Sequence, residues 1–316
     1  MNAPRGLEPR QTTSRVLMVR PATFYANPET LASNAFQHAD ASAPEVSLAA
    51  ARAEFDAMVQ LLSDAGVRVA VADAEASADT PDALFPNNWF STHADGRLVL
   101  YPMAAANRRR ERRPQLIAAL AAQHGWRIAR STDLSALEER GLIVEGTGSL
   151  VLDRVAGIAY AILSPRTHRE ALDLVCRELG YTPLAFHAHD RAGRAVYHTN
   201  VLMSVGPTLA LLGSALVSDA TERKALHASF ERAGKALLDL SAAQIDAFAG
   251  NALFLEDDAG VPLVAISRRA WLSLAPSQRV LLERHAAPVV CPADTIEHVG
   301  GGGVRCMIAE IFLPPA

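Results

Sequence analysis

Along the chain, apolar residues switch five times from helical spacing to strand-like alternation. The first instance is SLAAARAEFDAMVQLLSDAG (47–66), where apolar residues recur at helical intervals up to a glycine and the alternating run VRVAVAD follows. The later helical patterns lie at 114–125, 166–180 and 277–286, with a less regular one, including its short strand, at 221–241. The strand runs start near residues 67, 126, 183, 237 and 288. This spacing predicts five similar units of roughly 50–60 residues each.

Each unit continues into a polar stretch between two apolar runs. These stretches are PNNWF (86–90), EGTGSLVLD (145–153), YHTNVLMSV (197–205), GNALFLED (250–257) and GGGGVRC (300–306). If the units surround a pseudo-fivefold axis, the five stretches converge at one end of the molecule. A conventional layered α/β sheet is the alternative that the periodicity alone leaves open.

Composition narrows the class of protein. The chain has 316 residues, half of them apolar, which is enough for a large core. Its formal charge of -4 gives no broad electrostatic reason to bind nucleic acid or an anionic membrane. The first residues lack the apolar segment of a secretory signal, and no apolar run approaches the ~20 residues of a membrane span. We therefore expect a cytoplasmic protein that acts on small molecules.

The three cysteines, Cys176, Cys291 and Cys306, show neither metal-site spacing nor a disulfide pattern. Cys176 lies on the apolar face of a predicted helix and Cys291 ends an apolar strand, so both are interpreted as core thiols. Cys306 follows four glycines, which let a ligand approach the backbone closely, and Arg305 adds a positive charge that favours thiolate. A flexible turn before an ordinary buried cysteine is the alternative.

Two further residues carry candidate chemistry. His198 interrupts an apolar strand in VYHTNVLM, and Glu145 interrupts another in LIVEGTGSLVL. A buried carboxylate costs several kcal/mol unless it is paired, which favours a polar cavity or a cationic partner for Glu145. A structural role is the alternative for His198. If the five loops converge, Cys306, His198 and Glu145 supply a nucleophile, its acid/base partner and an orienting group.

The motifs PNNWF, EGTGS, HTN, GN and GGGGVRC, in this order, resemble the guanidino-group modifying superfamily of arginine deiminases, dimethylarginine hydrolases and amidinotransferases. The resemblance covers residues 16–315. It implies a five-bladed α/β propeller of ββαβ-type units, catalysis by Cys306, His198 and Glu145, and neither a metal nor an organic cofactor. The segments VRPATF (19–24) and FPNNWFS (85–91) are most similar to the citrulline-utilisation hydrolase branch.

Two departures from the deiminase pattern concern the substrate. Where deiminases carry an Arg-Asp pair this chain has Asn87 and Asn88, and where they carry His-x-Asp it has His198 and Asn200. A guanidinium ion offers only donors and a positive charge, which carboxylates match, whereas a neutral ureido group also has a carbonyl acceptor, which an amide matches. The amides therefore favour a citrulline-like substrate. An ordinary turn role for Asn88 and Asn200 is the alternative.

The resemblance assigns two more residues to substrate binding. Arg108, three residues before Glu111, matches the arginine that contacts the substrate carboxylate in deiminases, and Asn251 belongs to the GN motif. A solvated run of charges over NRRRERR (107–113) is the alternative for Arg108. A metal site at FHAHD (186–190) is not supported, because no third ligand has a recognisable spacing.

The sequence therefore predicts a cysteine-dependent hydrolase that cleaves a C–N bond, converting citrulline to ornithine, carbon dioxide and ammonia. We expect a flexible tail over residues 1–15 and one catalytic domain over residues 16–316, with homo-oligomer formation left open. The alternatives are an arginine deiminase or dihydrolase, an amidinotransferase, and a non-catalytic propeller that serves as a binding module.

Overall fold

The computed structural model describes residues 9–38 and 42–316. Its strands form five separate three-stranded sheets. In chain order the strands are β1 (Arg15–Arg20), β2 (Arg68–Asp73), β3 (Phe90–Thr92), β4 (Arg97–Leu100), β5 (Arg130–Asp133), β6 (Leu150–Asp153), β7 (Ile158–Ile162), β8 (Thr182–Phe186), β9 (Met203–Val205), β10 (Leu209–Leu212), β11 (Ala236–Asp239), β12 (Leu253–Glu256), β13 (Pro262–Ser267), β14 (Ala287–Cys291) and β15 (Ala309–Glu310).

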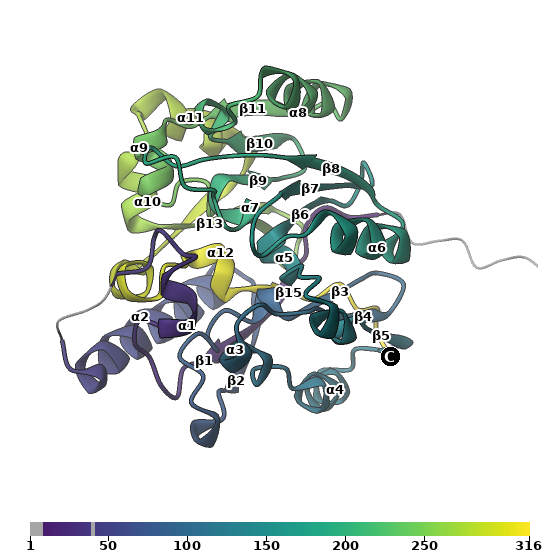
Figure 1. The fold of residues 1–316 in the computed structure, drawn as a ribbon, viewed down its shortest axis with the longest axis vertical. Coiled ribbons are helices and arrows are strands. Elements are labelled where there is room, and N and C mark those ends of the chain that lie inside the picture. Colours follow the sequence, from purple (N-terminus) through teal and green to yellow (C-terminus); the bar gives the residue numbers. More distant parts are fainter. Residues whose placement is uncertain (1–8, 39–41) are drawn as a thin grey trace, which may run out of the picture.

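All five sheets share one topology. The first strand runs antiparallel to the central strand, and the central strand runs parallel to the third. In the sheet that contains both ends of the chain, β15 is the first strand, so the C-terminal strand pairs with β1 and closes the ring. The sheets surround a common axis, as Figure 1 shows. The predicted five-bladed α/β propeller is thereby confirmed, and the layered sheet is excluded.

A helix connects the central and third strands of each sheet and covers the outside of the ring (Figure 1). These helices are α2 (Pro44–Asp64), α4 (Pro114–Gln123), α6 (Arg169–Leu179), α8 (Ala220–Arg232) and α11 (Pro276–His285), with α10 (Arg268–Ser273) before α11. In α6, Leu172, Val175 and Cys176 form a buried face, and Gly180 ends the helix at a φ of 76°, a backbone conformation that favours glycine. Cys176 and Cys291 are both buried in apolar clusters, as the sequence predicts.

Short helical turns lie nearer the axis or in connecting loops. They are α1 (Pro28–Leu31), η1 (Ala76–Ala78), η2 (Pro86–Asn88), α3 (Ala106–Arg109), η3 (Ser135–Arg140), α5 (Gly146–Ser149), α7 (Thr199–Leu202), η4 (Ser214–Leu216), α9 (Ala242–Asp246), the π-helix η5 (Ile296–Gly300) and α12 (Val304–Met307). Four of them, η2, α5, α7 and α12, immediately precede the first strands of their sheets. They correspond to four of the five polar stretches that the sequence singles out.

One strand begins later than its pattern predicts. The alternating run that starts at Trp126 becomes β5 only from Arg130. Trp126 instead donates its backbone N–H to the carbonyl of Ala121, and its buried ring packs in the apolar cluster beneath α4. Residues 126–129 therefore lie between the end of α4 at Gln123 and the start of β5 at Arg130.

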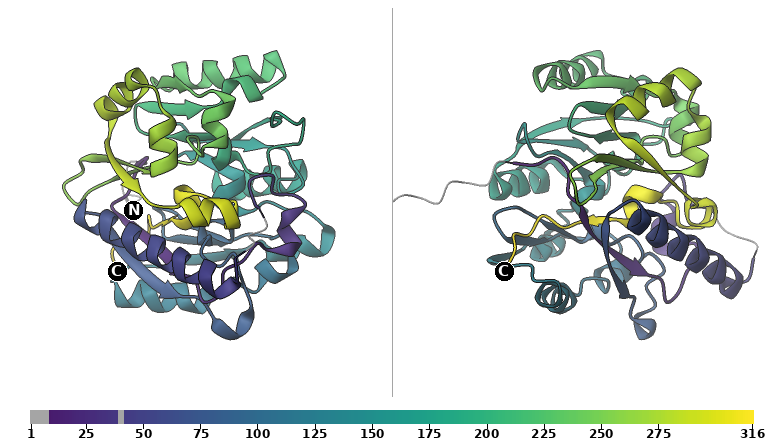
Figure 2. Two further views of the ribbon diagram at one scale, coloured as in Figure 1. Left: turned by 90° about the vertical axis from the view of Figure 1, so that its left-hand side faces the viewer. Right: turned by 180° about the vertical axis from the view of Figure 1, so that it is seen from behind.

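The N-terminal segment differs in part from the expected flexible tail. Residues 1–8 lie outside the described residues, but Gln11, Thr12 and Thr13 are buried. The side-chain amide of Gln11 donates to the carbonyls of Leu152 in β6 and Val205 in β9 at 2.9 and 3.0 Å, so it joins the first strands of two neighbouring sheets. The packed structure therefore extends at least to Gln11, and Figure 2 shows this segment from behind as it enters β1.

In the part of the chain that the structure describes, no helix combines the length and the apolar character that crossing a lipid bilayer requires.

Candidate active site

Four short turns and one loop meet at the end of the axis from which the first strands of the sheets depart. The turns α5, η2, α7 and α12 contact one another in pairs, and the loop at Gly250 and Asn251 supplies the fifth position. Packing is tight there, since a Cβ atom on Gly146 would lie 2.4 Å from the carbonyl oxygen of Asn87. The convergence of polar stretches that the repeat predicts is thus present in the structure.

Cys306 lies in α12 directly below the glycine-rich loop, and its side chain is buried. The amide nitrogen of Asn200 lies 3.4 Å from its sulfur, and that of Asn251 lies 3.3 Å from it. Gly302 is packed against Phe85 and the thiol, since an added Cβ would lie 2.9 Å from the phenyl ring and 3.3 Å from the Cβ of Cys306. The glycines therefore form a close-packed wall of the thiol pocket.

The orientation of the Asn251 amide is fixed by its other contacts. Its Oδ1 accepts from the backbone N–H of Arg305 at 3.1 Å, so Nδ2 must be the atom that faces the sulfur. Nδ2 also donates to the carbonyl of Asn200 at 2.8 Å. Asn251 thus presents an N–H to the thiol, which is the polarity that stabilises a thiolate.

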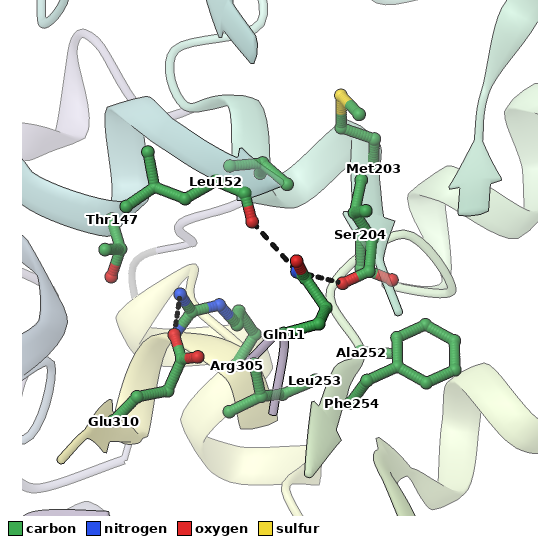
Figure 3. A pocket seen from close by; sticks show the side chains of 12 residues that line it. Gln11, Thr147, Leu152, Met203, Ser204, Ala252, Leu253, Phe254, Arg305 and Glu310 are labelled. Atoms are coloured by element: carbon green, nitrogen blue, oxygen red, sulfur yellow. Dashed lines mark hydrogen bonds and ion pairs between the residues drawn. The ribbon is translucent and has the colours of Figure 1, made fainter. Parts of the chain in front are cut away.

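Burial raises the pKa of the Cys306 thiol, and the Asn251 amide acts against this rise. The positive charge that the sequence places next to the thiol is directed elsewhere. The guanidinium of Arg305 donates to the carbonyl of Ile308 at 3.0 Å and to Glu310 at 2.9 Å, in a different pocket that also holds Gln11 and Ser204 (Figure 3). In the free protein the thiol is therefore protonated near neutral pH.

His198 and Glu145 form a buried pair. Nε2 of His198 donates to the Glu145 carboxylate at 2.8 Å, and the backbone N–H of Ala104 donates to its other oxygen at 2.9 Å. Burial alone would raise the pKa of Glu145, but Arg166, 3.6 Å away, and His198 outweigh it and hold the pKa well below the usual range. Glu145 is therefore a carboxylate.

Burial lowers the pKa of His198 to about 4, although the hydrogen bond to Glu145 acts in the opposite direction. The imidazole is thus neutral at pH 7. Because Nε2 carries the proton and donates it in a hydrogen bond to the carboxylate, Nδ1 carries the lone pair. Nδ1 faces the space above Gly148, where an added Cβ would lie 2.8 Å from it. A neutral base therefore lines the same pocket as the thiol.

Asn88 borders the same space. A Cβ on Gly148 would lie 2.4 Å from the Asn88 amide nitrogen. The amide oxygen is occupied, because Arg108 donates to it at 2.7 Å, so the group that Asn88 presents is an N–H donor. Asn87 accepts from Asn88 at 3.0 Å through its own oxygen and does not line the pocket.

Arg108 lines the pocket, but its guanidinium is committed to the protein. It makes two hydrogen bonds to Glu111, at 2.9 and 3.0 Å, besides the bond to Asn88. Burial alone would lower the pKa of Arg108, but Glu111 and Asp82 outweigh it and raise the pKa. Most donors of the Arg108 guanidinium are therefore used within the protein, one of them on Asn88, and its predicted contact with the substrate carboxylate stays a prediction.

Two charged residues of the pocket escaped the sequence analysis. Asp82 is buried, receives a hydrogen bond from Asn27 at 2.7 Å, and has a second oxygen, Oδ1, without a hydrogen-bond partner among the described residues. Arg166 stacks on Tyr197, with its guanidinium carbon 4.7 Å from the ring centroid. A signal existed for Arg166, since it follows the central strand of its unit as Arg108 follows that of the unit before.

Within residues 9–38 and 42–316, no group of three or more histidine, cysteine, aspartate or glutamate side chains is arranged to hold a metal ion. His187 of the FHAHD stretch instead contacts Glu222 at 2.9 Å.

Comparison with known proteins identifies a family that this chain matches. A sequence model of the eukaryotic N,N-dimethylarginine dimethylhydrolases matches residues 20–313. No curated protein matches the chain.

Several solved structures share the fold. The N-terminal domain of ArgZ, an arginine dihydrolase from Cyanobacteria, superposes with a TM-score of 0.71 at 15% identity, over 95% of this chain and 99% of that domain. A citrulline complex of DDAH from Pseudomonas aeruginosa superposes with a TM-score of 0.66 at 13% identity, over 95% and 99% of the two chains. AgrE with ornithine and NAD+ gives a TM-score of 0.72 at 15% identity, over 96% of this chain and 40% of that one. At these identities the likeness shows the fold.

Proposed function

Because this chain belongs to the N,N-dimethylarginine dimethylhydrolase family, within the guanidino-group modifying superfamily, we propose that it is a cysteine-dependent hydrolase of C–N bonds in ureido or guanidino amino acids, with citrulline as its substrate. The observation that carries the proposal is the environment of Cys306. Two amide N–H groups point at its sulfur, and a neutral imidazole held by a carboxylate lines the same pocket.

Cys306 is proposed as the nucleophile. As its sulfur attacks the ureido carbon, Nδ1 of His198 takes the thiol proton, and Glu145 stabilises the resulting histidinium. His198 then delivers the proton to the departing δ-nitrogen, so ornithine leaves and a carbamoyl group remains on the sulfur. In the second half, His198 takes a proton from water, whose oxygen attacks the carbamoyl carbon. The thiol is restored, and carbamate is released, which decomposes to carbon dioxide and ammonia.

The amino-acid end of the substrate is proposed to lie between Asp82 and Arg166. The unpartnered Oδ1 of Asp82 is suited to an α-ammonium group, since a buried carboxylate oxygen without a donor is unfavourable. Arg166 is the other pocket guanidinium. Its Nε and Nη2 donate to Ser33 and Thr30, but among the described residues its Nη1 has no hydrogen bond and lies 3.6 Å from Glu145, so Nη1 retains donors for an α-carboxylate. Arg108, by contrast, is proposed to orient Asn88.

The side-chain amides around the thiol favour a substrate with a ureido group. Asn88 presents a donor, which suits the ureido oxygen, and Asn200 has a buried amide oxygen without a partner among the described residues, which suits a substrate N–H. Among the described residues that line the pocket with the thiol, Asp82 is the one carboxylate, and it is assigned here to the α-ammonium group, while Glu145 is committed to His198.

One observation favours a second candidate, arginine. The thiol has a raised pKa, and the guanidinium of Arg305 is directed away from it. A guanidinium ion bound beside the sulfur would favour the thiolate by electrostatic attraction, which a neutral ureido group does not do. The rates at which the protein turns over citrulline and arginine therefore distinguish the two candidates.

All five sheets contribute to this site: Asn88, Glu145, His198, Asn251 and Cys306 each precede the first strand of a different sheet. We therefore propose that residues 16–316 act as one catalytic domain. The same distribution argues against a binding module with an incidental thiol, because a module of that kind has no need of a donor pair on the sulfur.

The role of Asn251 provides a test. Asn251→Asp keeps the shape and the acceptor for the Arg305 N–H but replaces the N–H donor with a carboxylate oxygen, which disfavours the thiolate. We expect the apparent pKa of Cys306, measured as the pH dependence of iodoacetamide alkylation, to rise by about one to two units. The pH profile of kcat/KM for citrulline should move by the same amount. Unchanged profiles would remove Asn251 from the mechanism.

A further inference from the structure

A groove of about 400 Å3 lies at the opposite end of β1 from the candidate active site. Its walls come from the start of β1, the start of β2, residues 10–14 and the last residues of the chain. β1 spans six residues, so its two ends are about 20 Å apart. The groove is thus separate from the thiol pocket, and the proposed hydrolase activity does not use it.

Three arginines line the groove, and two of them are paired by the sheet itself. Arg15 of β1 and Arg68 of β2 are register partners on neighbouring parallel strands, so their side chains leave the same face side by side. Arg10 lies in the same groove. Like charges at neighbouring positions of a sheet are unfavourable unless something neutralises them.

The neighbouring carboxylates neutralise only two of these three charges. Asp258 lies 2.7 Å from Arg68, and Glu256 pairs with Arg10. The guanidinium of Arg15 has neither a hydrogen bond nor an ion pair to any residue that the structure describes. Burial lowers the pKa of Arg15, and the charges of Arg68 and Arg10 lower it further.

The remaining wall of the groove is apolar. It consists of Ala94, Phe312, Pro314 and Pro315. Opposite this wall, Arg15 keeps all its N–H donors, and Arg68 uses its Nε on Asp258. Two adjacent guanidinium groups with free donors match the oxygens of a carboxylate or phosphate, and the apolar wall matches a carbon skeleton.

We propose that this groove binds a small organic anion, with its carboxylate or phosphate oxygens held between Arg15 and Arg68 and its apolar part against Phe312 and the two prolines. Such a ligand supplies the negative charge that the arginine pair lacks. It binds at the end of β1 where the carbonyl of Arg15 accepts from the N–H of Ile311, on the segment that leads back to Cys306.

Thermal unfolding of the full chain tests the site, with inorganic phosphate and phenyl phosphate as probes at constant ionic strength. At a phosphate concentration about tenfold above its dissociation constant, we expect the Tm of the wild type to rise by about 2–4 °C. Phenyl phosphate should reach the same rise at lower concentration because of the apolar wall. Benzoate, tested in parallel, shows whether a carboxylate serves as well as a phosphate.

Two variants make the test decisive. Arg15→Gln should abolish the rise and, by relieving the repulsion, should not lower the Tm in the absence of phosphate. Arg177→Gln, a change at an exposed arginine of α6, should respond like the wild type. Equal rises in the wild type and Arg15→Gln would reflect general stabilisation by an excluded salt and would overturn the proposal.

Discussion

Replacing Cys306 with serine should abolish the turnover of citrulline while leaving the fold intact. A serine hydroxyl beside a neutral imidazole is a far weaker nucleophile than a thiolate, and loss of the nucleophile removes the covalent route entirely. We expect kcat to fall by roughly 10⁴-fold or more, measured as ornithine release. The Tm should change little, since the two side chains have nearly the same shape.

Cys176→Ser and Cys291→Ser are the matched controls. Both thiols are buried in apolar clusters, neither lines the pocket, and burial raises the pKa of each to about 12, so neither is a candidate nucleophile. Their serine variants should lose stability but keep kcat. If Cys306→Ser retains near-normal turnover, the covalent mechanism is wrong.

Asn88→Asp should shift the substrate preference from citrulline toward arginine. The change replaces the N–H that faces the pocket with a carboxylate oxygen, which repels the ureido carbonyl and attracts a guanidinium ion. The mismatch should cost about 1–3 kcal/mol, which corresponds to a loss of roughly 5- to 150-fold in kcat/KM for citrulline. Arg108, 2.7 Å from the Asn88 oxygen, keeps the new charge paired and the fold intact.

The measurement is kcat/KM for both substrates in the wild type and in Asn88→Asp, so that each protein serves as its own control for concentration and folding. A citrulline-to-arginine ratio that stays constant, or that rises, would show that Asn88 does not discriminate substrate charge.

The repeat pattern predicted five similar units, and the resemblance to the guanidino-group modifying superfamily was needed to choose the propeller over a layered sheet. The helix predicted over 47–66 is α2, Pro44–Asp64, and that predicted over 166–180 contains α6, Arg169–Leu179, because an outer helix with one buried face leaves a clear period in the sequence. The turns α5, α7 and α12 were not predicted as helices. Each has four residues, too few for a period, and tertiary contacts hold them in place.

The site was predicted less completely. His198 and Glu145 were identifiable because each interrupts an apolar run, and Cys306 because it follows four glycines and an arginine. The structure places Cys306 and His198 beside one pocket and Glu145 in contact with His198. The contacts of Asn200 and Asn251 with the sulfur span 106 and 55 residues of sequence, so they depend on how the sheets close around the axis. The sequence assigned both residues to substrate binding. Only the structure shows that their amides also lie next to the sulfur of Cys306.

Arg305 does not direct its positive charge at the Cys306 thiol, as its position next to Cys306 in the sequence had suggested. Its neighbour is Cys306, yet the two side chains of this tight turn point into different pockets. Asp82 and Arg166 were missed for the opposite reason. Asp82 lies in a loop without a motif. Arg166 follows a central strand as Arg108 does, but it has no motif of its own, and the closure of the ring brings both residues within one pocket.

The most direct test of the account is product analysis of the purified wild-type protein with citrulline and, separately, with arginine. The account predicts that citrulline disappears while ornithine and ammonia accumulate in equal amounts, that Cys306→Ser releases neither, and that arginine is the poorer substrate by kcat/KM. Conversion of arginine to citrulline without further conversion of citrulline to ornithine would contradict it, because the protein would then act on the guanidinium ion and not on the ureido group.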